Sequence, residues 1–225
     1  MFQISQERDY NSFIDVLQAI DEHKAADVRQ IDVLIKIDYF AQFGNQRTLL
    51  RICDMYEKFK RGAIKKMKKE PIAGTVMEHI VQKYATGTNK DGKEAASWTF
   101  FDVHGAMAEC EQVVREAGLS DLPDIIKIKN FSDIMGYVGY VSGKEEDRPK
   151  LYVKEVYPLK RKKDDAQFGY SVITQSIGSG RESRFTVYNR VFNKDPIKKD
   201  DLIICKGFTR EGQYFTLTSY VHIYE

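Results

Sequence analysis

The sequence predicts an α+β protein, in which an all-α N-terminal half precedes a small antiparallel β-barrel. Two observations along the 225 residues support this prediction. Apolar residues recur at helical spacing in the first half, as at Phe13, Val16, Leu17 and Ile20. From about Met135 onward, short β-rich runs separated by turn residues replace that spacing.

The composition is that of a folded chain, since 42% of the residues are hydrophobic and 12% are aromatic. The net charge of +2 is too small to indicate a nucleic-acid binder, so such a function must depend on local charge. Three widely separated cysteines predict no disulfide framework and favour a reducing, cytoplasmic compartment. We find no signal peptide and no apolar run near the ~18 residues of a membrane span, and we expect no membrane partner.

A hairpin of two amphipathic helices is predicted between Asp27 and Phe59, with its turn at Phe43-Gly44-Asn45. Asp27 is suited to cap the first helix, because its carboxylate can accept the free N–H groups of the first turn. This layout is typical of a helix-hairpin-helix, which presents a turn and a helix N-terminus to a nucleic-acid backbone. The apolar positions of the two helices are Val28, Ile31, Leu34 and Ile35, then Leu49, Ile52, Cys53 and Tyr56.

The residues of this turn suit a phosphate group. Gly44 permits a backbone conformation that bulky residues resist, and Asn45 is a good N-cap for the second helix. A helix N-terminus carries about half a positive charge and unpaired N–H groups. Arg47 lies in the first turn and could hold the same phosphate. The alternative is an ordinary turn between packed helices with a solvated arginine.

A basic run follows the hairpin, between Lys58 and Lys69, and contains no acid. Such a run, which includes Lys65 and Lys66, attracts polyanions through counterion release. The alternative is a solvated helix end or a linker that charge keeps soluble.

We interpret residues 63–122 as a helical connector. Helices are predicted over Thr75–Tyr84 and Ala106–Ala117, and the turn-rich residues 85–96 predict a loop. The aromatic residues that follow this loop, Trp98, Phe100 and Phe101, are expected in the core.

Six β-rich runs are predicted in the second half: Met135–Ser142, Lys150–Leu159, Gly169–Ile177, Ser183–Phe192, Leu202–Phe208 and Tyr214–Tyr224. In the last run, Phe215, Leu217, Val221 and Ile223 fall on one expected buried face. Five or six strands in this length fit a small Greek-key barrel such as an OB-fold, which binds oligonucleotides on its second and third strands. A small sandwich is the alternative.

Three features of this half suit a single strand of nucleic acid. The glycine-rich stretch Ser176–Arg184 is expected to form a flexible, basic hairpin tip with Arg181 and Arg184. Lys160–Lys163 form a compact basic cluster. The strand after the glycine loop places Thr186, Tyr188 and Arg190 on a polar face, which combines stacking with backbone charge. The alternative for each feature is a solvated hairpin or sheet face.

No enzymatic constellation is apparent. The four histidines lack metal-ligand spacing, and no P-loop or GxSxG motif occurs. The acidic pairs Asp164-Asp165 and Asp200-Asp201 follow lysines in turn-like settings, whereas a two-metal site needs carboxylates that converge in a cleft. Cys53 and Cys205 are expected in the core. We therefore predict no catalytic residue, no metal and no cofactor; a nuclease or nucleotidyltransferase would need a metal site.

Leu34-Ile35-Lys36 through Gly44–Leu50 resembles the helix-hairpin-helix of family C bacterial DNA polymerase III alpha subunits. Gly136–Tyr140, Thr174–Gly180 and Val191–Lys198 with Asp201–Ile203 are similar to the C-terminal region of alpha subunits from low-GC Gram-positive bacteria and their phages. Family members usually carry Gly-Ala-Phe-Asp at the hairpin, where this chain has Asp38-Tyr39-Phe40-Ala41. The palm aspartates and the metal-binding N-terminal domain of that family have no counterpart here, and we find no Gln-x-x-Leu-Phe clamp motif.

The resemblance implies a helix-hairpin-helix domain at residues 1–62, a connector at 63–122 and an OB-like barrel domain at 123–225. It implies a non-catalytic DNA-binding region of a replicative polymerase, which grips duplex and single-stranded template without sequence specificity. A protein-interaction module that docks a sliding clamp or clamp loader is the alternative. The expected DNA-binding residues are Lys36, Gly44, Asn45, Arg47, Lys65, Lys66, Arg181, Arg184, Tyr188 and Arg190.

Overall fold

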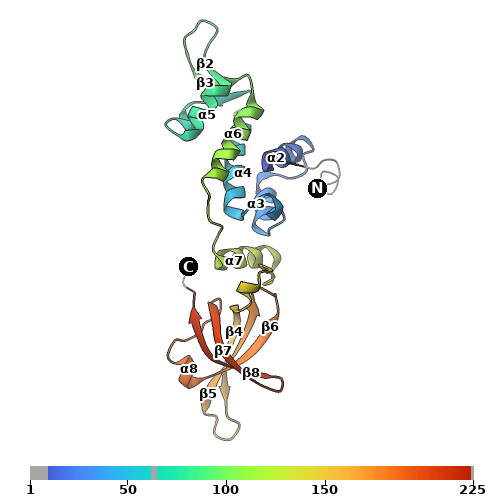
Figure 1. Ribbon diagram of the computed structural model, residues 1–225, viewed down its shortest axis with the longest axis vertical. Helices are drawn as coiled ribbons and strands as arrows, with labels where there is room; N and C mark the ends of the chain where they lie inside the picture. The colour runs from blue at the N-terminus through green and yellow to red at the C-terminus, as the bar shows by residue number, and fades with distance from the viewer. Residues whose placement is uncertain (1–9, 62–64, 224–225) are drawn as a thin grey trace. The chain divides into compact units, whose positions relative to one another are not determined.

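The computed structural model describes residues 10–61 and 65–223, and the chain divides into two compact units, Met1–Leu122 and Pro123–Glu225 (Figure 1). The first unit combines helices with a three-stranded sheet, and the second contains a closed five-stranded barrel. The predicted α+β class is therefore confirmed. The predicted boundary between residues 62 and 63 lies outside the described residues, while the parts of the first unit on either side of it share one hydrophobic core.

Among the described residues of the first unit, five α-helices pack around that core: α2 (Phe13–Glu22), α3 (Val28–Lys36), α4 (Gln46–Arg61), α5 (Val76–Tyr84) and α6 (Val103–Glu116). The predicted helical spacing is borne out in α2, where Phe13, Leu17 and Ile20 are buried. Asp27 caps α3 as predicted, since its side chain accepts from the Gln30 N–H at 2.9 Å. Short 3₁₀ turns lie at Ala41–Phe43 and Glu70–Ile72.

The predicted helical connector also contains an antiparallel sheet, in the order β1 (Lys66–Lys68), β3 (Glu94–Phe100), β2 (Ala85–Thr88). The prediction of a loop at residues 85–96 is therefore wrong, because β2 and the start of β3 form a hairpin around a tight turn. Trp98 is buried as expected. Phe101 is 72% exposed, because it follows the last residue of β3 and precedes Asp102, the N-cap of α6.

The second unit begins with α7 (Asp124–Met135) and a 3₁₀ turn at Glu145–Asp147. The barrel strands are β4 (Lys150–Lys160), β5 (Gln167–Ser176), β6 (Glu182–Tyr188), β7 (Leu202–Glu211) and β8 (Tyr214–His222), and α8 (Asn189–Phe192) follows β6. The strands close in the order β4-β5-β6-β8-β7; β6 and β8 run parallel, and the other neighbouring pairs are antiparallel. The barrel, rather than the alternative sandwich, is therefore present.

One predicted strand is absent from the structure, and another is shorter than predicted. Met135–Ser142 forms no strand: α7 ends at Met135, Gly136 adopts a left-handed conformation, and an irregular segment follows. The run Ser183–Phe192 is a strand only as far as Tyr188, where α8 begins.

A bulge in β8 changes which side chains face the barrel core. Gly207 pairs with Ser219, but Phe208 pairs with Leu217, so one extra residue stands between them on β8. A bulge reverses the alternation beyond it. Tyr220 therefore packs against the core and Val221 is 50% exposed, which contradicts the prediction that Val221 shares a buried face with Leu217.

Candidate nucleic-acid interface

The turn of the predicted hairpin begins at the end of α3, which forms a Schellman motif. The Tyr39 N–H donates to the Leu34 carbonyl and the Asp38 N–H donates to the Ile35 carbonyl, both at 3.0 Å. Asp38 has a φ of 61°, the left-handed conformation that this motif requires. Its carboxylate accepts a 3.0 Å hydrogen bond from Nε2 of Gln46, so the end of α3 is joined to the start of α4.

The N-terminus of α4 is covered by a short segment of the same chain, Leu119–Asp121. Asn45 caps the helix as predicted, because its Oδ1 accepts from the Thr48 N–H at 2.8 Å. Its Nδ2 donates to the Leu119 carbonyl at 2.8 Å, and the Gln46 N–H donates to Oδ1 of Asp121 at 3.1 Å. An internal carboxylate thus lies where the sequence predicts a phosphate.

The remaining predicted hairpin residues are also held within this unit. Nη1 of Arg47 lies 3.3 Å from Oγ of Ser120. Lys36 forms an ion pair of 2.7 Å with Asp32, one turn earlier on α3. The structure therefore brings Gly44, Asn45 and Arg47 together at one helix end, and Lys36 lies at the end of the preceding helix.

Gly44 occupies a position with two constraints. Its φ of 142° is a conformation that side chains rarely adopt, and a Cβ there would lie 3.4 Å from Nη1 of Arg115. That guanidinium donates to the Phe43 carbonyl at 2.8 Å and to Glu111 at 2.9 Å and 2.6 Å. Glu111 is 4% exposed and also accepts the first N–H groups of α2. Sequence reasoning missed this pair, for which the only signal is its i, i+4 spacing on α6.

The outer surface of β4, β5 and β6 carries exposed tyrosines and an arginine, and we call Tyr157, Arg184, Thr186 and Tyr188 the tyrosine face. Tyr157 lies opposite Ser171, which lies opposite Thr186, so these side chains form one row across three strands. Arg184 lies opposite Ile173 on the same side of the barrel. Tyr157 is 48% exposed and Tyr188 is 50% exposed, so both rings have a free surface for stacking.

The position of Tyr188 depends on its cross-strand neighbour. Gly169 lies opposite Tyr188, and a Cβ at Gly169 would lie 2.6 Å from the Val187 carbonyl oxygen. The ring of Phe168 lies 6.2 Å from that of Tyr188 at an angle of 44°. Sequence reasoning missed both Phe168 and Tyr157. The alternating side chains of β4 are the signal for Tyr157, although a bulge beside Lys154 interrupts them.

The hydroxyl of Tyr157 donates to the carboxylate of Glu155, on the same strand. This hydrogen bond raises the pKa of the Tyr157 hydroxyl, so the ring remains neutral at physiological pH.

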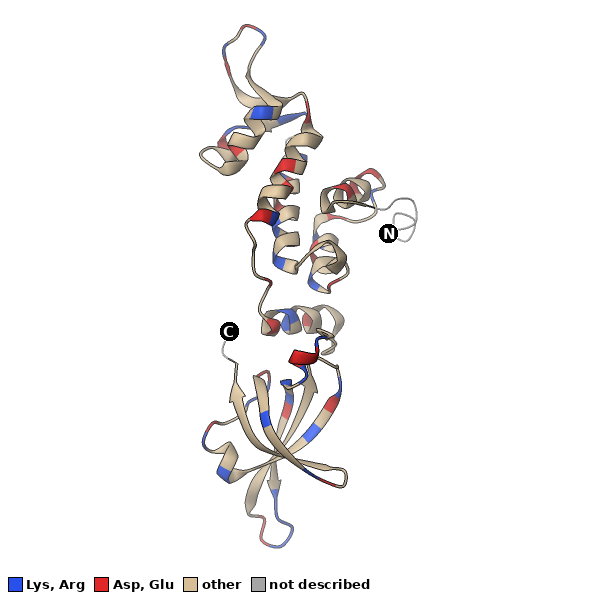
Figure 2. Cartoon of the chain, in the orientation of Figure 1, with Lys and Arg blue, Asp and Glu red and all other residues tan. Residues whose placement is uncertain are grey.

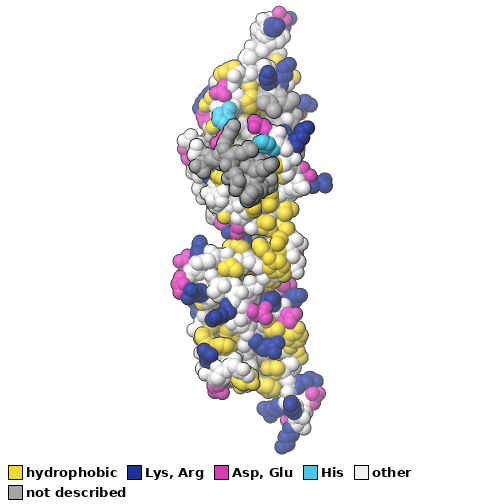
Figure 3. Space-filling view, turned by 90° about the vertical axis from the view of Figure 1, so that its right-hand side faces the viewer, with side chains coloured by type: hydrophobic (Ala, Val, Ile, Leu, Met, Phe, Trp, Pro, Cys, Tyr) yellow, Lys and Arg dark blue, Asp and Glu magenta, His cyan; other side chains and the backbone are white. Residues whose placement is uncertain are grey.

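The basic cluster at Lys160–Lys163 lies at the β4–β5 loop, where two acids, Asp164 and Asp165, follow the four basic residues (Figure 2). Lys160 pairs with Asp165 at 2.8 Å, and Arg161 lies 4.0 Å from Asp164. Figure 3 shows the same mixture of basic and acidic side chains at the lower end of the barrel. The acids therefore neutralise half of the cluster, and Lys162 and Lys163 stay exposed.

Two predicted DNA-binding residues of the barrel, Arg181 in the glycine-rich turn and Arg190, do not belong to the tyrosine face. Ile177 and Gly178 are buried, so the glycine-rich turn is packed rather than flexible, although Arg181 is exposed. Arg190 belongs to α8, so the prediction that it shares a strand face with Tyr188 is wrong. The cause is that β6 ends at Tyr188 and the helical turn changes the side-chain direction.

The fold and this face define a two-unit α+β protein whose barrel presents an exposed polar and aromatic surface. Comparisons with protein-family models, with curated proteins and with solved structures each give no match. Within residues 10–61 and 65–223, no three His, Cys, Asp or Glu side chains lie where they could hold a metal ion. In the same part of the chain, no helix has the length and apolar character to cross a membrane.

Proposed function

We propose that the chain is a non-catalytic DNA-binding region of a replicative DNA polymerase III alpha subunit. In this proposal, the barrel binds single-stranded template and the α3–α4 hairpin binds the backbone of duplex DNA. The observation that carries it is the tyrosine face, whose side chains lie on β4 and β6 on either side of β5 in a closed five-stranded barrel; this outer face includes that of the second and third strands, β5 and β6. OB-folds bind oligonucleotides on that face and in the adjoining loops.

The chemistry of the tyrosine face fits binding without sequence specificity. Exposed tyrosine rings can stack on any base, and each stacked base contributes about 1–3 kcal/mol. Arg184 supplies a cation for the backbone, and Thr186 supplies a hydroxyl group on the same face. None of these groups needs to read a base edge.

The α3–α4 hairpin supports the resemblance on which this proposal also depends. Asp38 stands where family C members usually have glycine, and its φ of 61° is a conformation that glycine adopts at little cost. The departure from the family motif is therefore compatible with the same backbone path through the turn.

The test is a salt titration of the full chain with fluorescent oligothymidylate. We expect Tyr157→Ala/Tyr188→Ala to weaken binding by about 30-fold or more, the loss that corresponds to two stacking contacts. Tyr137→Ala is the matched control, because Tyr137 is 56% exposed and belongs to the loop after α7. Undetectable binding of the wild type at low salt, or equal loss in the control, contradicts the proposal.

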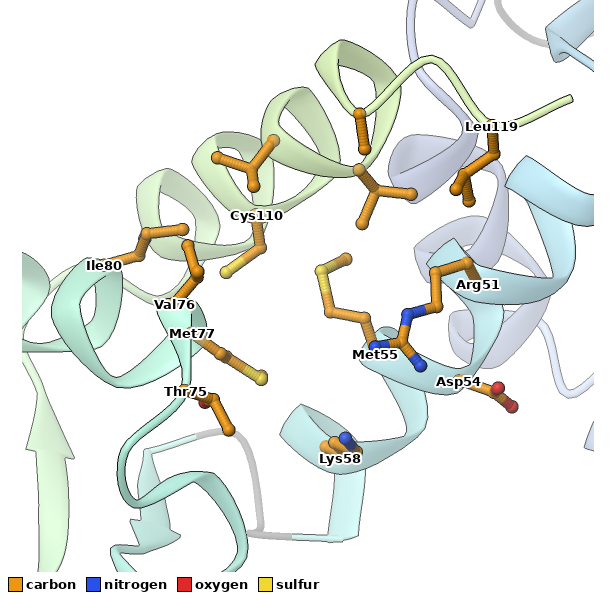
Figure 4. A pocket seen from close by; sticks show the side chains of 13 residues that line it. Arg51, Asp54, Met55, Lys58, Thr75, Val76, Met77, Ile80, Cys110 and Leu119 are labelled. Atoms are coloured by element: carbon orange, nitrogen blue, oxygen red, sulfur yellow. The ribbon is translucent and has the colours of Figure 1, made fainter.

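A second candidate, a module that docks a sliding clamp or clamp loader, is favoured by an apolar groove between α4, α5 and α6 (Figure 4). Its volume is about 390 Å³, and Met55, Met77 and Cys110 point into it. Arg51, Asp54 and Lys58 line its α4 side, and the net positive charge of these three residues suits a peptide with apolar anchors and acidic flanks. Pull-down of either partner by a chain that binds no DNA supports this candidate.

A further inference from the structure

We propose that the outer face of the β1–β3–β2 sheet is a second nucleic-acid surface, which binds the phosphodiester backbone. This inference rests on the proposed DNA-binding function and assigns it an additional surface. We define the sheet face as Lys66, Lys68, Thr86, Ser97 and Thr99.

The strand register places these side chains on one side. Lys66 lies opposite Thr99, and Thr99 lies opposite Thr86, so a lysine and two hydroxyls form a row across all three strands. Lys68 lies opposite Ser97 in the neighbouring row. Directly paired residues point to the same side of a sheet, so the face combines ammonium and hydroxyl groups.

The opposite side of the sheet is fixed in the core. Met67 and Trp98 are directly paired and buried, and the Phe100 ring packs against that of Phe59 with centroids 5.6 Å apart and an angle of 48° between the rings. Lys69 lies over the Trp98 ring at 4.8 Å, donates to the Gly87 carbonyl at 3.0 Å and pairs with Glu94, so its charge is held within the unit and is not part of the sheet face. The sheet face therefore stands on a packed layer and needs no rearrangement to present its side chains.

Charge identifies the partner as a polyanion. Lys65, Lys66 and Lys68 are exposed, and the structure shows no ion pair for them within the described residues (Figure 2). The directly paired rows of the face contain no carboxylate. Lysine ammonium groups release counterions from a phosphate backbone, and threonine and serine hydroxyls donate to phosphate oxygens.

The same residues argue against other partners. Membrane-surface binding needs an apolar side that enters the lipid, and protein interfaces depend on buried aromatic or aliphatic anchors. The sheet face has neither, since its members are lysines and small hydroxyl residues. A regular polyanion with phosphate acceptors fits it best.

The test is a salt titration of the full chain with a 20-base-pair duplex as the probe. Each phosphate contact contributes about 0.9 to the slope of log K against log salt concentration. We expect Lys66→Gln/Lys68→Gln to lower the slope by about 1 to 2, with unchanged thermal unfolding. Lys90→Gln/Lys93→Gln is the control, because it removes the same charge from the β2–β3 turn of the same unit.

The outcomes separate this inference from the proposed function. If the wild type binds DNA and both lysine pairs give the wild-type slope, the sheet face is not a contact and the barrel proposal stands. If the wild type binds no DNA, both fail. Competition by polyglutamate at the same charge concentration, as effective as the duplex itself, would indicate a general anion site and overturn the assignment to a nucleic-acid backbone.

Discussion

Asp121 accepts a 3.1 Å hydrogen bond from the backbone N–H of Gln46, the first residue of α4. A carboxylate at a helix N-terminus satisfies an unpaired N–H group and interacts favourably with the helix dipole. The contact therefore stabilises α4 and, in the same position, competes with any phosphate that approaches this helix end.

Asp121→Asn separates these two effects. We expect it to lower the free energy of unfolding by about 1 kcal/mol, because the charge at the helix end is lost. We also expect tighter duplex binding, because Arg47 and the helix N-terminus then face less negative charge. Chemical denaturation and duplex titration measure the two quantities. Asp54→Asn, an exposed change within α4, is the control, and unchanged affinity in Asp121→Asn would remove the hairpin from the interface.

The variants Asp38→Gly and Asp38→Ala differ in how easily residue 38 adopts the left-handed backbone conformation. Both lose the hydrogen bond from Gln46, but only glycine adopts the φ of 61° without a penalty. We expect Asp38→Ala to be about 1 kcal/mol less stable than Asp38→Gly in urea denaturation. Equal stability of the two variants would show that the left-handed conformation is not retained.

Glu111→Ala removes a buried carboxylate that accepts from Phe13, Ile14 and Arg115. Since those donors are left without their acceptor, we expect a loss of about 3 kcal/mol in unfolding free energy. Glu116→Ala, an exposed position on the same helix, serves as the control. A small loss, equal to that of the control, would mean that water replaces the carboxylate.

The carboxylate of Asp147 contributes to the stability of the second unit in a way that depends on pH. Burial acts to raise the pKa of its carboxyl, but hydrogen bonds from Lys150 and Ser142 outweigh burial and lower the pKa. A lowered folded-state pKa stabilises the protein above the unfolded value of about 4, and that stability is lost as pH falls through the folded pKa. We expect Asp147→Asn to be less stable than wild type near neutral pH and the difference to shrink below about pH 4, in urea denaturation at each pH.

The buried thiols are expected to react slowly. Burial raises the pKa of Cys110 and of Cys53 to about 12, so roughly one thiol in ten thousand is ionised at pH 8. A disulfide reagent should therefore label both far more slowly in the native protein than in denaturant. Because Cys110 lines the apolar groove, a bound peptide should slow its labelling further and leave that of Cys53 unchanged.

The helices that the sequence predicts are those with a strong apolar stripe. In α2, the buried residues follow one face, so spacing alone locates the helix. In α7, only Lys127 and Ile128 are buried and Ile126 is 43% exposed, so no such stripe marks it. The strand β1 is hidden for another reason: it has one buried residue, Met67, between lysines, and its identity as a strand depends on pairing with β3.

The residues of the candidate sites also fall into those that a local sequence pattern predicts and those that depend on tertiary contacts. Thr186 and Tyr188 lie on a regularly alternating strand, so local pattern predicts that they share one face, whereas Arg184, predicted in the flexible hairpin tip, lies on the same strand. The Asp121 contact joins residues 75 positions apart in the chain, and no local pattern contains that information. What sequence reasoning finds here is governed by short-range periodicity, and what it misses is governed by tertiary contacts.

The strand pairing of the closed barrel determines where the second unit begins to unfold. β6 and β8 pair only at Phe185↔Phe215 and Thr186↔Thr216, and β4 and β7 pair at three positions, whereas β4 pairs with β5 along nearly its whole length. A ring opens at its shortest join, so amide hydrogens at the β6–β8 seam should exchange with deuterium before those of β5. Opening there would create two free strand edges at once, which makes the seam the place where domain exchange or aggregation of this unit would start.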